Sequence, residues 1–444
     1  MNNKVPSEVF CLAPWTHTYI SPQSERRICC ASREEHSFIH QYIDGSNTNH
    51  NKSEYAPDTL ENFWNSERVR NIRLKMLKGE APPECVVCNE KILSLSPYRD
   101  YFTKELFPHL VDEAIASTDE SGRTSLKPRS FDYRFTNKCN FKCRMCGDQL
   151  SSSWEQEKRK HNTWTPESHP WMTVEIDKKI KHFQKETVEK EFLDAILKNE
   201  VEEIYWVGGE PLAWDLHWQV MQFLVDSDKA KNIYIRYNTN LSIIQWKGRD
   251  LVADLLPHFK GYAIYASIDA IGPIGEYIRT GLDWNKWIQN LDHAIIHAKQ
   301  KPEAKVLLDL TLTLPGLFGL KDLVDFAKSR DLPVEPKIVY AFDPSIAISP
   351  LALPRELLNE VVDDLIKHIF PIADKNNYRV LNTLIDLKKR ATHAEAYPDN
   401  WKESLQQGKD YLRYLEKIRN DSFGMNDVLV GYPKILHWWQ QDVI

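Results

Sequence analysis

The sequence predicts an α/β fold that is built on a parallel sheet. Six short runs of apolar or alternating residues are typical of strands, and helical periodicity separates most of them. Because strands and helices alternate along the chain, we expect parallel strands with right-handed crossovers. The alternation is compatible with an open, partial barrel and with a doubly wound sheet. The expected strands are residues 131–135, 203–207, 232–237, 262–268, 306–313 and 334–340.

Helical periodicity is clearest between these strands and again after about residue 350. The expected helices of the sheet region are residues 187–197, 214–225, 251–259, 284–299 and 320–329. The last hundred residues are expected to be helical, at 355–369, 379–392 and 401–419. A short amphipathic helix is also expected at residues 101–116, inside a polar connector. The chain therefore divides into a cysteine-rich segment, a connector, an α/β region and a helical extension.

Length and composition are those of an ordinary globular protein. The chain has 444 residues, a formal net charge of −6 and 27% charged residues, and this balance disfavours nucleic acid as the main partner. No apolar run is long enough to span a membrane, and the N-terminus lacks the apolar region of a signal peptide. We therefore expect a cytoplasmic protein. Thiols stay reduced in the cytoplasm, so its 8 cysteines are better interpreted as metal ligands than as disulfides.

Three closely spaced cysteines follow the first expected strand. Cys139, Cys143 and Cys146 form the pattern C-x3-C-x2-C. Three thiolates leave one iron of a four-iron cluster open, and an open position is what distinguishes catalytic metal sites from structural ones. The alternative interpretation is a zinc site that recruits a later histidine such as His161.

Glycine-rich or polar segments follow two later strands. Ligands of parallel α/β folds bind at the carboxyl ends of strands, so these segments are candidate binding elements. Gly-Gly-Glu-Pro follows the second strand; its glycines let the backbone approach a ligand, and its glutamate can accept from a cation. Ser267 and Asp269 lie where the fourth strand ends, and Arg279 follows; a helix cap and a surface arginine are the ordinary alternatives. The glycine-rich segment consists of Gly208, Gly209, Glu210 and Pro211.

The cysteine pattern followed by Gly-Gly-Glu-Pro resembles the radical S-adenosylmethionine (SAM) superfamily. The resemblance implies a partial (β/α)6 parallel barrel, in which the open iron of a 4Fe-4S cluster binds the amino and carboxylate groups of SAM. An electron from the cluster then cleaves SAM, and the resulting 5′-deoxyadenosyl radical abstracts hydrogen from a substrate. Two departures from the usual motifs are Met145 in place of an aromatic residue and Ala270 in place of a glycine.

The same resemblance implies a role for each candidate residue. The implied cluster ligands are Cys139, Cys143 and Cys146. Residues 208–211 are expected to bind the SAM amino group, while Ser267 and Asp269 are expected to face its ribose or carboxylate. Arg279 is expected to face the carboxylate, which a guanidinium suits by geometry. No residue stands out as a catalytic acid, base or radical relay.

A second group of cysteines lies in the first 90 residues. Cys85 and Cys88 form a C-x2-C pattern of the sort that holds zinc or iron–sulfur centres, and Cys11 with Cys29 or Cys30 completes four thiolates. The segment resembles the shortened "twitch" form of the SPASM-like auxiliary-cluster element in radical SAM enzymes that modify peptides. A group of these enzymes shares its position before the SAM domain. The resemblance implies a second 4Fe-4S cluster on Cys11, Cys29, Cys85 and Cys88, with Cys30 a buried bystander.

The resemblance covers roughly residues 9–345 and gives the whole chain an expected organisation. Residues 1–93 are expected to form the auxiliary domain, 94–129 the connector, 130–345 the radical SAM core and 346–444 the helical extension. The expected substrate is a peptide or protein side chain, and the expected electron donor is a flavodoxin or ferredoxin. RNA, a lipid or a small metabolite is the alternative substrate, and a non-enzymatic zinc protein that binds partners is the remote alternative.

Overall fold

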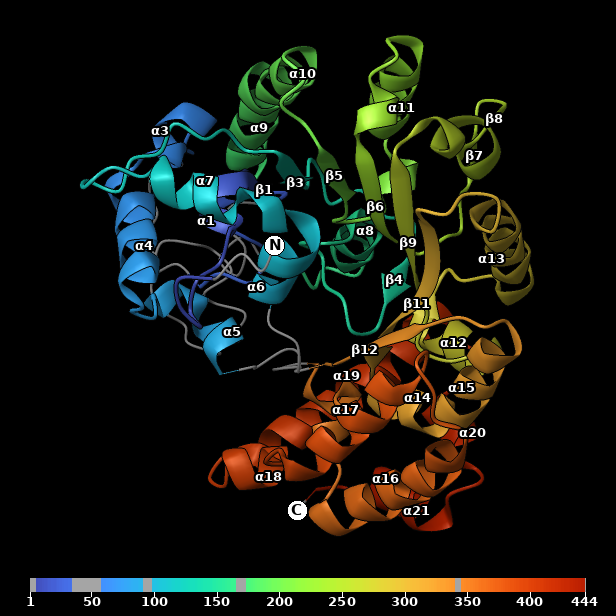
Figure 1. The fold of residues 1–444 in the computed structure, drawn as a ribbon. Coiled ribbons are helices and arrows are strands. Elements are labelled where there is room, and N and C mark those ends of the chain that lie inside the picture. The colour runs from blue at the N-terminus through green and yellow to red at the C-terminus, as the bar shows by residue number, and fades with distance from the viewer. Residues whose placement is uncertain (1–4, 34–56, 91–97, 165–172, 340–344, 444) are drawn as a thin grey trace. The chain divides into compact units, whose positions relative to one another are not determined.

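Eight strands form one sheet in the part of the chain that the computed structural model describes, namely residues 5–33, 57–90, 98–164, 173–339 and 345–443 (Figure 1). Their order is β12-β11-β9-β6-β5-β3-β1-β2. The pairs β1–β3, β3–β5 and β11–β12 are parallel, and β1–β2 is antiparallel. The predicted α/β fold with a parallel sheet is therefore confirmed, whereas the partial barrel stays a prediction. The strands are β1 (His17–Ile20), β2 (Arg26–Arg27), β3 (Ser130–Tyr133), β5 (Glu203–Trp206), β6 (Tyr234–Thr239), β9 (Gly261–Ser267), β11 (Ala304–Leu312) and β12 (Val334–Ile338).

Most of the expected helices form close to their predicted positions. Between the strands lie α10 (Glu189–Leu197), α11 (Asp215–Asp226), α13 (Trp284–Ala298) and α15 (Leu320–Ser329). The C-terminal extension is helical, with α16 (Arg355–Ile369), α17 (Tyr378–Lys389), α18 (His393–Ala396), α19 (Trp401–Arg419), α20 (Met425–Leu429) and α21 (Pro433–Gln440). The predicted boundary at residue 93 and the end of the strand predicted at 334–340 lie outside the described residues.

Two expected helices are irregular, and a proline accounts for each. In place of one helix at 101–116 the chain forms a π-helix (Tyr101–Leu106), a 3-10 turn (Pro108–Leu110) and α7 (Val111–Ala116). In place of the helix at 251–259 it forms a π-helix (Leu251–Leu255) and a 3-10 turn (Leu256–His258). Pro108 and Pro257 lack the N–H that a regular helix needs, and the proline ring clashes with the preceding turn.

The described residues form two compact units. The first unit comprises Met1–Lys138, Gln156–Arg236 and His258–Tyr262. The second comprises Cys139–Glu155, Tyr237–Pro257 and Ala263–Ile444. The chain therefore passes from the first unit to the second immediately before the three closely spaced cysteines.

Aromatic side chains from the sheet and from α10 form the core of the first unit. Phe192 of α10 lies 5.6 Å from the rings of both Phe131 and Tyr133 in β3, and 6.1 Å from the ring of Trp206 in β5. All four side chains are buried. Packing of this kind stabilises a βα unit through both area burial and edge-to-face ring contacts.

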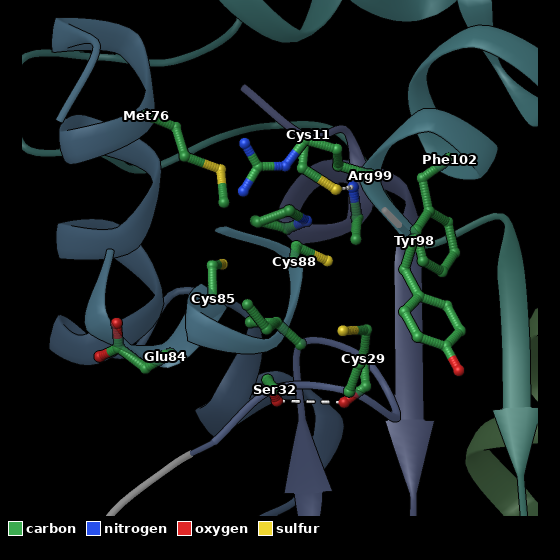
Figure 2. A pocket seen from close by; sticks show the side chains of 14 residues that line it. Cys11, Cys29, Ser32, Met76, Glu84, Cys85, Cys88, Tyr98, Arg99 and Phe102 are labelled. Carbon is green, nitrogen blue, oxygen red and sulfur yellow. Dashed lines mark hydrogen bonds between the residues drawn. The ribbon is translucent and has the colours of Figure 1, made fainter. Parts of the chain in front are cut away.

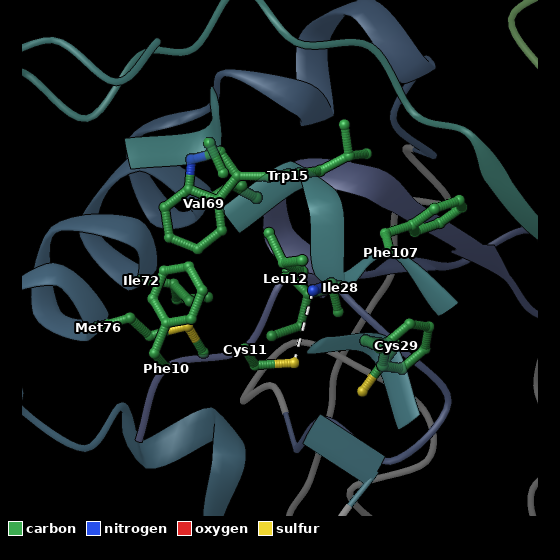
Figure 3. Close-up of a cluster of buried hydrophobic side chains, with 14 of the residues drawn as sticks. Phe10, Cys11, Leu12, Trp15, Ile28, Cys29, Val69, Ile72, Met76 and Phe107 are labelled. Carbon is green, nitrogen blue, oxygen red and sulfur yellow. Dashed lines mark hydrogen bonds between the residues drawn. The ribbon is translucent and has the colours of Figure 1, made fainter. Parts of the chain in front are cut away.

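The N-terminal segment adds an unexpected strand and a core of its own to the first unit. β1 pairs with β3 from His17↔Ser130 to Ile20↔Tyr133, so the cysteine-rich segment extends the sheet. Beside it lie α1 (Ala13–Thr16), α3 (Leu60–Trp64), α4 (Glu67–Lys78) and α5 (Val86–Asn89). Figure 3 shows side chains of this core, which include Trp15, Ile72, Cys11 and Cys29. Two of the candidate metal ligands are therefore buried in a hydrophobic cluster.

The second unit combines the remaining sheet with the helical extension. β11 and β12 pair in register from Leu308↔Val334 to Leu312↔Ile338. A separate two-stranded ladder joins β4 (Lys142–Cys143) to β10 (Arg279–Thr280), which directly follows α12 (Gly272–Ile278). Among the helices that the structure describes, none combines the length and apolarity needed to cross a bilayer.

Candidate functional site

The three closely spaced cysteines lie in a short loop that is anchored by a β-bridge. Cys143 belongs to β4 and is the register partner of Arg279 in β10. The Cys146 N–H donates to the Cys143 carbonyl at 3.0 Å, so these two thiols flank a tight turn. Cys143 is buried, while Cys139 and Cys146 are partly exposed. The loop therefore presents three thiols from one segment of the second unit.

Burial and the same neighbouring guanidinium affect the pKa of two of these thiols. Burial raises the pKa of the Cys143 thiol well above its usual range; the Arg279 guanidinium opposes this, and charges on Cys146 and Cys139 add to it. Burial likewise raises the pKa of Cys146, against the effect of Arg279. A buried thiolate needs a cation to stabilise it, and the iron ions of a cluster provide one. The donor set therefore fits a cluster with three cysteine ligands.

The described residues contain no group of three or more His, Cys, Asp or Glu side chains that converges on a single metal ion. A 4Fe-4S cluster carries its thiolates on different irons, so its ligands surround a cluster and do not meet at one point. The assignment of Cys139, Cys143 and Cys146 as ligands stays a prediction.

Asp269 and Arg279, both predicted to face SAM, are partners of each other in this structure. Arg279 Nε lies 2.7 Å from Asp269 Oδ2, and Arg279 Nη2 donates to Asp269 Oδ1 at 2.9 Å. The Thr311 N–H also donates to Asp269 Oδ1, at 2.9 Å. The two side chains are 0% and 7% exposed, so the surface-arginine alternative for Arg279 is wrong. Ser267 ends β9, two residues before Asp269.

We expect Asp269→Asn to lower the free energy of unfolding by about 3–5 kcal/mol, the usual effect of removing one partner of a buried ion pair. The asparagine can still accept from the Thr311 N–H, so the loss of stability would come from leaving the buried Arg279 without its carboxylate partner. Chemical unfolding of the metal-free protein measures the change. The matched control is Asp292→Asn, which breaks the exposed 3.0 Å pair with Arg330 and should change stability by about 1 kcal/mol or less. Equal effects of the two substitutions would show that the buried pair is not special.

The glycine-rich segment packs on the backbone that leads into the cysteine loop. Glu210 N–H donates to the Lys138 carbonyl at 2.7 Å, and a Cβ on Gly209 would lie 2.3 Å from that same oxygen. Gly208 has a φ of +106°, which favours glycine. Pro211 begins a 3-10 turn (Pro211–Ala213). Both glycines are therefore required by this local structure, and the segment is fixed against the residue that precedes Cys139.

The Glu210 side chain is buried in the first unit. It is 1% exposed, and its Oε1 accepts from the Leu212 N–H at 3.1 Å. A carboxylate that accepts a backbone N–H at the start of a turn acts as a cap. A carboxylate can accept more than one hydrogen bond.

Four cysteines of the N-terminal segment line one pocket in the first unit (Figure 2). They are Cys11, Cys29, Cys85 and Cys88. The other lining side chains include Met76, Tyr98, Arg99 and Phe102. The pKa of Cys11 is raised to about 12, mainly by burial; the hydrogen bond from the Ala13 N–H and the charge of Arg99 oppose this rise, and a charge on Cys88 adds to it. The pocket thus gathers four thiols from three separate segments, which is the donor set of a closed cluster.

The structure distinguishes Cys29 from Cys30 as the fourth cysteine of the pocket, which the sequence could not do. Burial raises the pKa of Cys29 well above its usual range, and charges on Cys30, Cys88, Cys85 and Cys11 act in the same direction. Cys29 therefore belongs with the four-thiol pocket.

Cys30 lies in different surroundings. Burial and the Asp132 carboxylate raise the pKa of its thiol, and the guanidiniums of Arg134, Arg27 and Arg236 lower it. The charges that affect the two thiols therefore differ: other thiols for Cys29, and an aspartate and three arginines for Cys30. Cys30 also does not line the pocket, and it is partly exposed, so the expectation that it is buried is wrong.

Sequence reasoning missed a lysine beside the cysteine loop. Lys337 of β12 lies 2.7 Å from Asp309 Oδ2, which also accepts from Asn238 Nδ2 at 2.9 Å. Charge on Lys337 lowers the pKa of Cys146, although burial and Arg279 have larger effects. The only sequence signal was its place near the end of a predicted strand.

Comparison with known families places this site in a recognised domain. Residues 133–318 match the family model of the Radical SAM superfamily. The matched segment contains the three-cysteine loop, residues 208–211 and the Asp269–Arg279 pair. This segment of the chain is therefore similar to the Radical SAM superfamily. No curated protein sequence matches the chain at a significant level.

Solved structures resemble parts of the chain. SuiB of Streptococcus suis bound to precursor peptide SuiA has 15% identity, covers 60% of this chain and 52% of its own, and gives a TM-score of 0.34. SuiB bound to S-adenosylmethionine has 16% identity, with coverages of 58% and 52% and a TM-score of 0.35. Native anSMEcpe with bound AdoMet has 16% identity, with coverages of 53% and 59% and a TM-score of 0.34. The chain spans less than two thirds of each of these proteins.

Proposed function

We propose that this chain is a radical SAM enzyme that cleaves SAM reductively and abstracts hydrogen from a peptide or protein side chain. The observation that carries the proposal is the loop of Cys139, Cys143 and Cys146, in which the buried Cys143 is the register partner of Arg279. This loop lies inside the segment that matches the radical SAM family. When bound, the cluster and SAM supply a 5′-deoxyadenosyl radical.

The residues of the chain contribute binding and orientation. The thiolates of Cys139, Cys143 and Cys146 would hold the cluster, which would bind SAM at the iron that they leave open. Glu210 accepts from the SAM ammonium group. Asp269 contacts two nitrogens of Arg279, so the two side chains would act as one rigid unit. Arg279 would then contact the SAM carboxylate only through its remaining N–H groups.

The four-thiol pocket supports a second, auxiliary cluster. Four thiolates from Cys11, Cys29, Cys85 and Cys88 would close its coordination, which suits an electron-relay or structural role. A reducing protein such as a flavodoxin or ferredoxin would supply the electrons. The peptide substrate rests on the resemblance of this segment to the auxiliary element of peptide-modifying enzymes.

Metal content tests the proposal against the zinc alternative. After anaerobic reconstitution with iron and sulfide, we expect about eight irons per chain, from two four-iron centres. Stoichiometric zinc without an iron chromophore would favour the zinc-binding interpretation. The substrate class is tested separately, by asking whether a peptide fraction stimulates 5′-deoxyadenosine formation more than RNA, lipid or metabolite fractions from the same cells.

We expect Glu210→Gln to weaken SAM binding about tenfold or more, because a charge-assisted hydrogen bond shielded from water is worth roughly 1.5–3 kcal/mol. Glutamine keeps an oxygen that can accept from the Leu212 N–H, so the turn should survive. Titration of SAM into the reconstituted protein measures the change. The control is Glu202→Gln, at a partly exposed ion pair with Arg129. Unchanged SAM affinity in Glu210→Gln would assign this carboxylate to capping alone.

A further inference from the structure

The C-terminal end of α19 contacts the cysteine loop within the second unit. Arg419, the last residue of α19, donates from Nη1 to the Lys142 carbonyl and to Thr280 Oγ1, both at 3.1 Å. Its guanidinium lies 4.5 Å from the ring centre of Trp154. Trp154 Nε1 in turn donates to the Cys143 carbonyl at 2.8 Å. The carbonyls of Lys142 and Cys143 are thus both held by side chains, one of them from a helix far along the chain.

A second connection runs through Arg144, which stands between the second and third cysteines. Its side chain is fully buried and lies 3.8 Å from the ring centre of Tyr277. It donates to Thr280 Oγ1 at 2.8 Å and to the Tyr277 carbonyl, and it forms an ion pair with Asp421. Asp421 lies two residues after the end of α19. The loop therefore depends on a carboxylate of the C-terminal extension to neutralise its buried guanidinium.

The end of α19 is shaped so that these two residues face the loop. Asn420 adopts a left-handed conformation with a φ of +54°, and the Asp421 N–H donates back to the Glu416 carbonyl at 3.0 Å. Glu416 Oε1 accepts from Tyr277 Oη at 2.7 Å and from the Met425 N–H at 2.9 Å. A left-handed cap ends a helix sharply and directs the following residue back across it.

We infer that Arg419 and Asp421 are positioning residues for the cysteine loop, so the C-terminal extension is part of the SAM site. This inference rests on the proposed function. The loop is short, and one of the two residues between its second and third cysteines is Arg144, whose charge is neutralised from outside the loop. Without Arg419, the Lys142 carbonyl loses this side-chain donor, and Trp154 loses the guanidinium that lies over its ring. Without the Asp421 charge, the Arg144 guanidinium stays buried without its carboxylate, which is costly.

Hydrogen–deuterium exchange of the metal-free protein tests the positioning role directly. We expect Arg419→Met and Asp421→Asn each to speed exchange of the segment 139–150 about tenfold, because each removes charge-assisted bonds that hold it closed. Arg419→Lys, which keeps a charge and a donor, should recover part of the protection. The control is Arg413→Met on the same helix, where the side chain pairs with Asp410 at 2.9 Å. Exchange in that segment that is no faster in Arg419→Met and Asp421→Asn than in the control would overturn the inference.

The reconstituted protein provides a second readout. In Arg419→Met we expect the change that SAM induces in the electron paramagnetic resonance spectrum of the reduced cluster to be lost or at least tenfold harder to titrate. The auxiliary signal should be unchanged, and Arg413→Met should match wild type. A wild-type SAM response in Arg419→Met would overturn the inference. If wild type itself showed no SAM response, the proposed function would fail, and the exchange experiment would still decide whether α19 positions the loop.

Discussion

Cys143→Ala should abolish formation of 5′-deoxyadenosine and halve the iron content, from about eight to about four irons per chain. Cys143 is the most buried of the three loop cysteines and is fixed by the β-bridge to Arg279. Its loss leaves two thiolates, too few to hold a cluster that still presents an open iron. The four-thiol pocket lies in a different part of the sequence and should keep its own iron.

Iron and sulfide analysis, together with product detection by chromatography, measures both effects of Cys143→Ala. The matched control is Cys30→Ala, which removes a thiol outside both predicted ligand sets. If Cys143→Ala still produced 5′-deoxyadenosine, the loop would not be the SAM-binding site. If it lost all eight irons, the two clusters would depend on each other.

Cys29→Ser should remove the auxiliary cluster, while Cys30→Ser leaves it intact. The two residues are neighbours in sequence, yet only Cys29 lines the pocket with Cys11, Cys85 and Cys88. Cys29→Ser should therefore lower iron from about eight to about four per chain and abolish substrate turnover, while SAM cleavage without substrate persists. Cys30→Ser should keep the full iron content.

Spectra of the reduced clusters and iron content distinguish these variants of Cys29 and Cys30. The reverse result, with iron lost only in Cys30→Ser, would assign the fourth ligand to Cys30. Loss in neither variant would mean that the auxiliary centre has three cysteine ligands and an open iron. Such an iron could bind substrate directly.

Periodicity predicted the sheet well because buried parallel strands are short apolar runs, and β5, β9 and β11 are of this kind. It missed β1, whose His17-Thr-Tyr-Ile sequence is buried on all four residues but has a polar beginning. That strand is defined by its pairing with β3, which is a long-range contact. The proline breaks at 101–116 and 251–259 were visible in the sequence, and local chemistry rather than tertiary contact explains them.

The candidate site was predictable where its chemistry lies in consecutive residues. The C-x3-C-x2-C loop and Gly208-Gly209-Glu210-Pro211 are motifs, and they were read from the chain alone. Arg279 was expected to be available to SAM, but its pairing with Asp269 emerges only when the first residue of β10 meets the segment that follows β9. The support of the loop by Arg419 joins residues 277 positions apart, which no local pattern encodes.

The most direct test of the central claim is the reductive cleavage of SAM by the reconstituted wild-type protein. With anaerobic handling and a strong reductant, we expect 5′-deoxyadenosine to accumulate with time in the wild-type protein and to be absent from Cys143→Ala. The measurement is made alongside iron and sulfide content, so that an empty protein is not mistaken for an inactive one. A wild-type protein that carries its full iron and sulfide yet forms no 5′-deoxyadenosine would contradict the proposal that this chain cleaves SAM reductively.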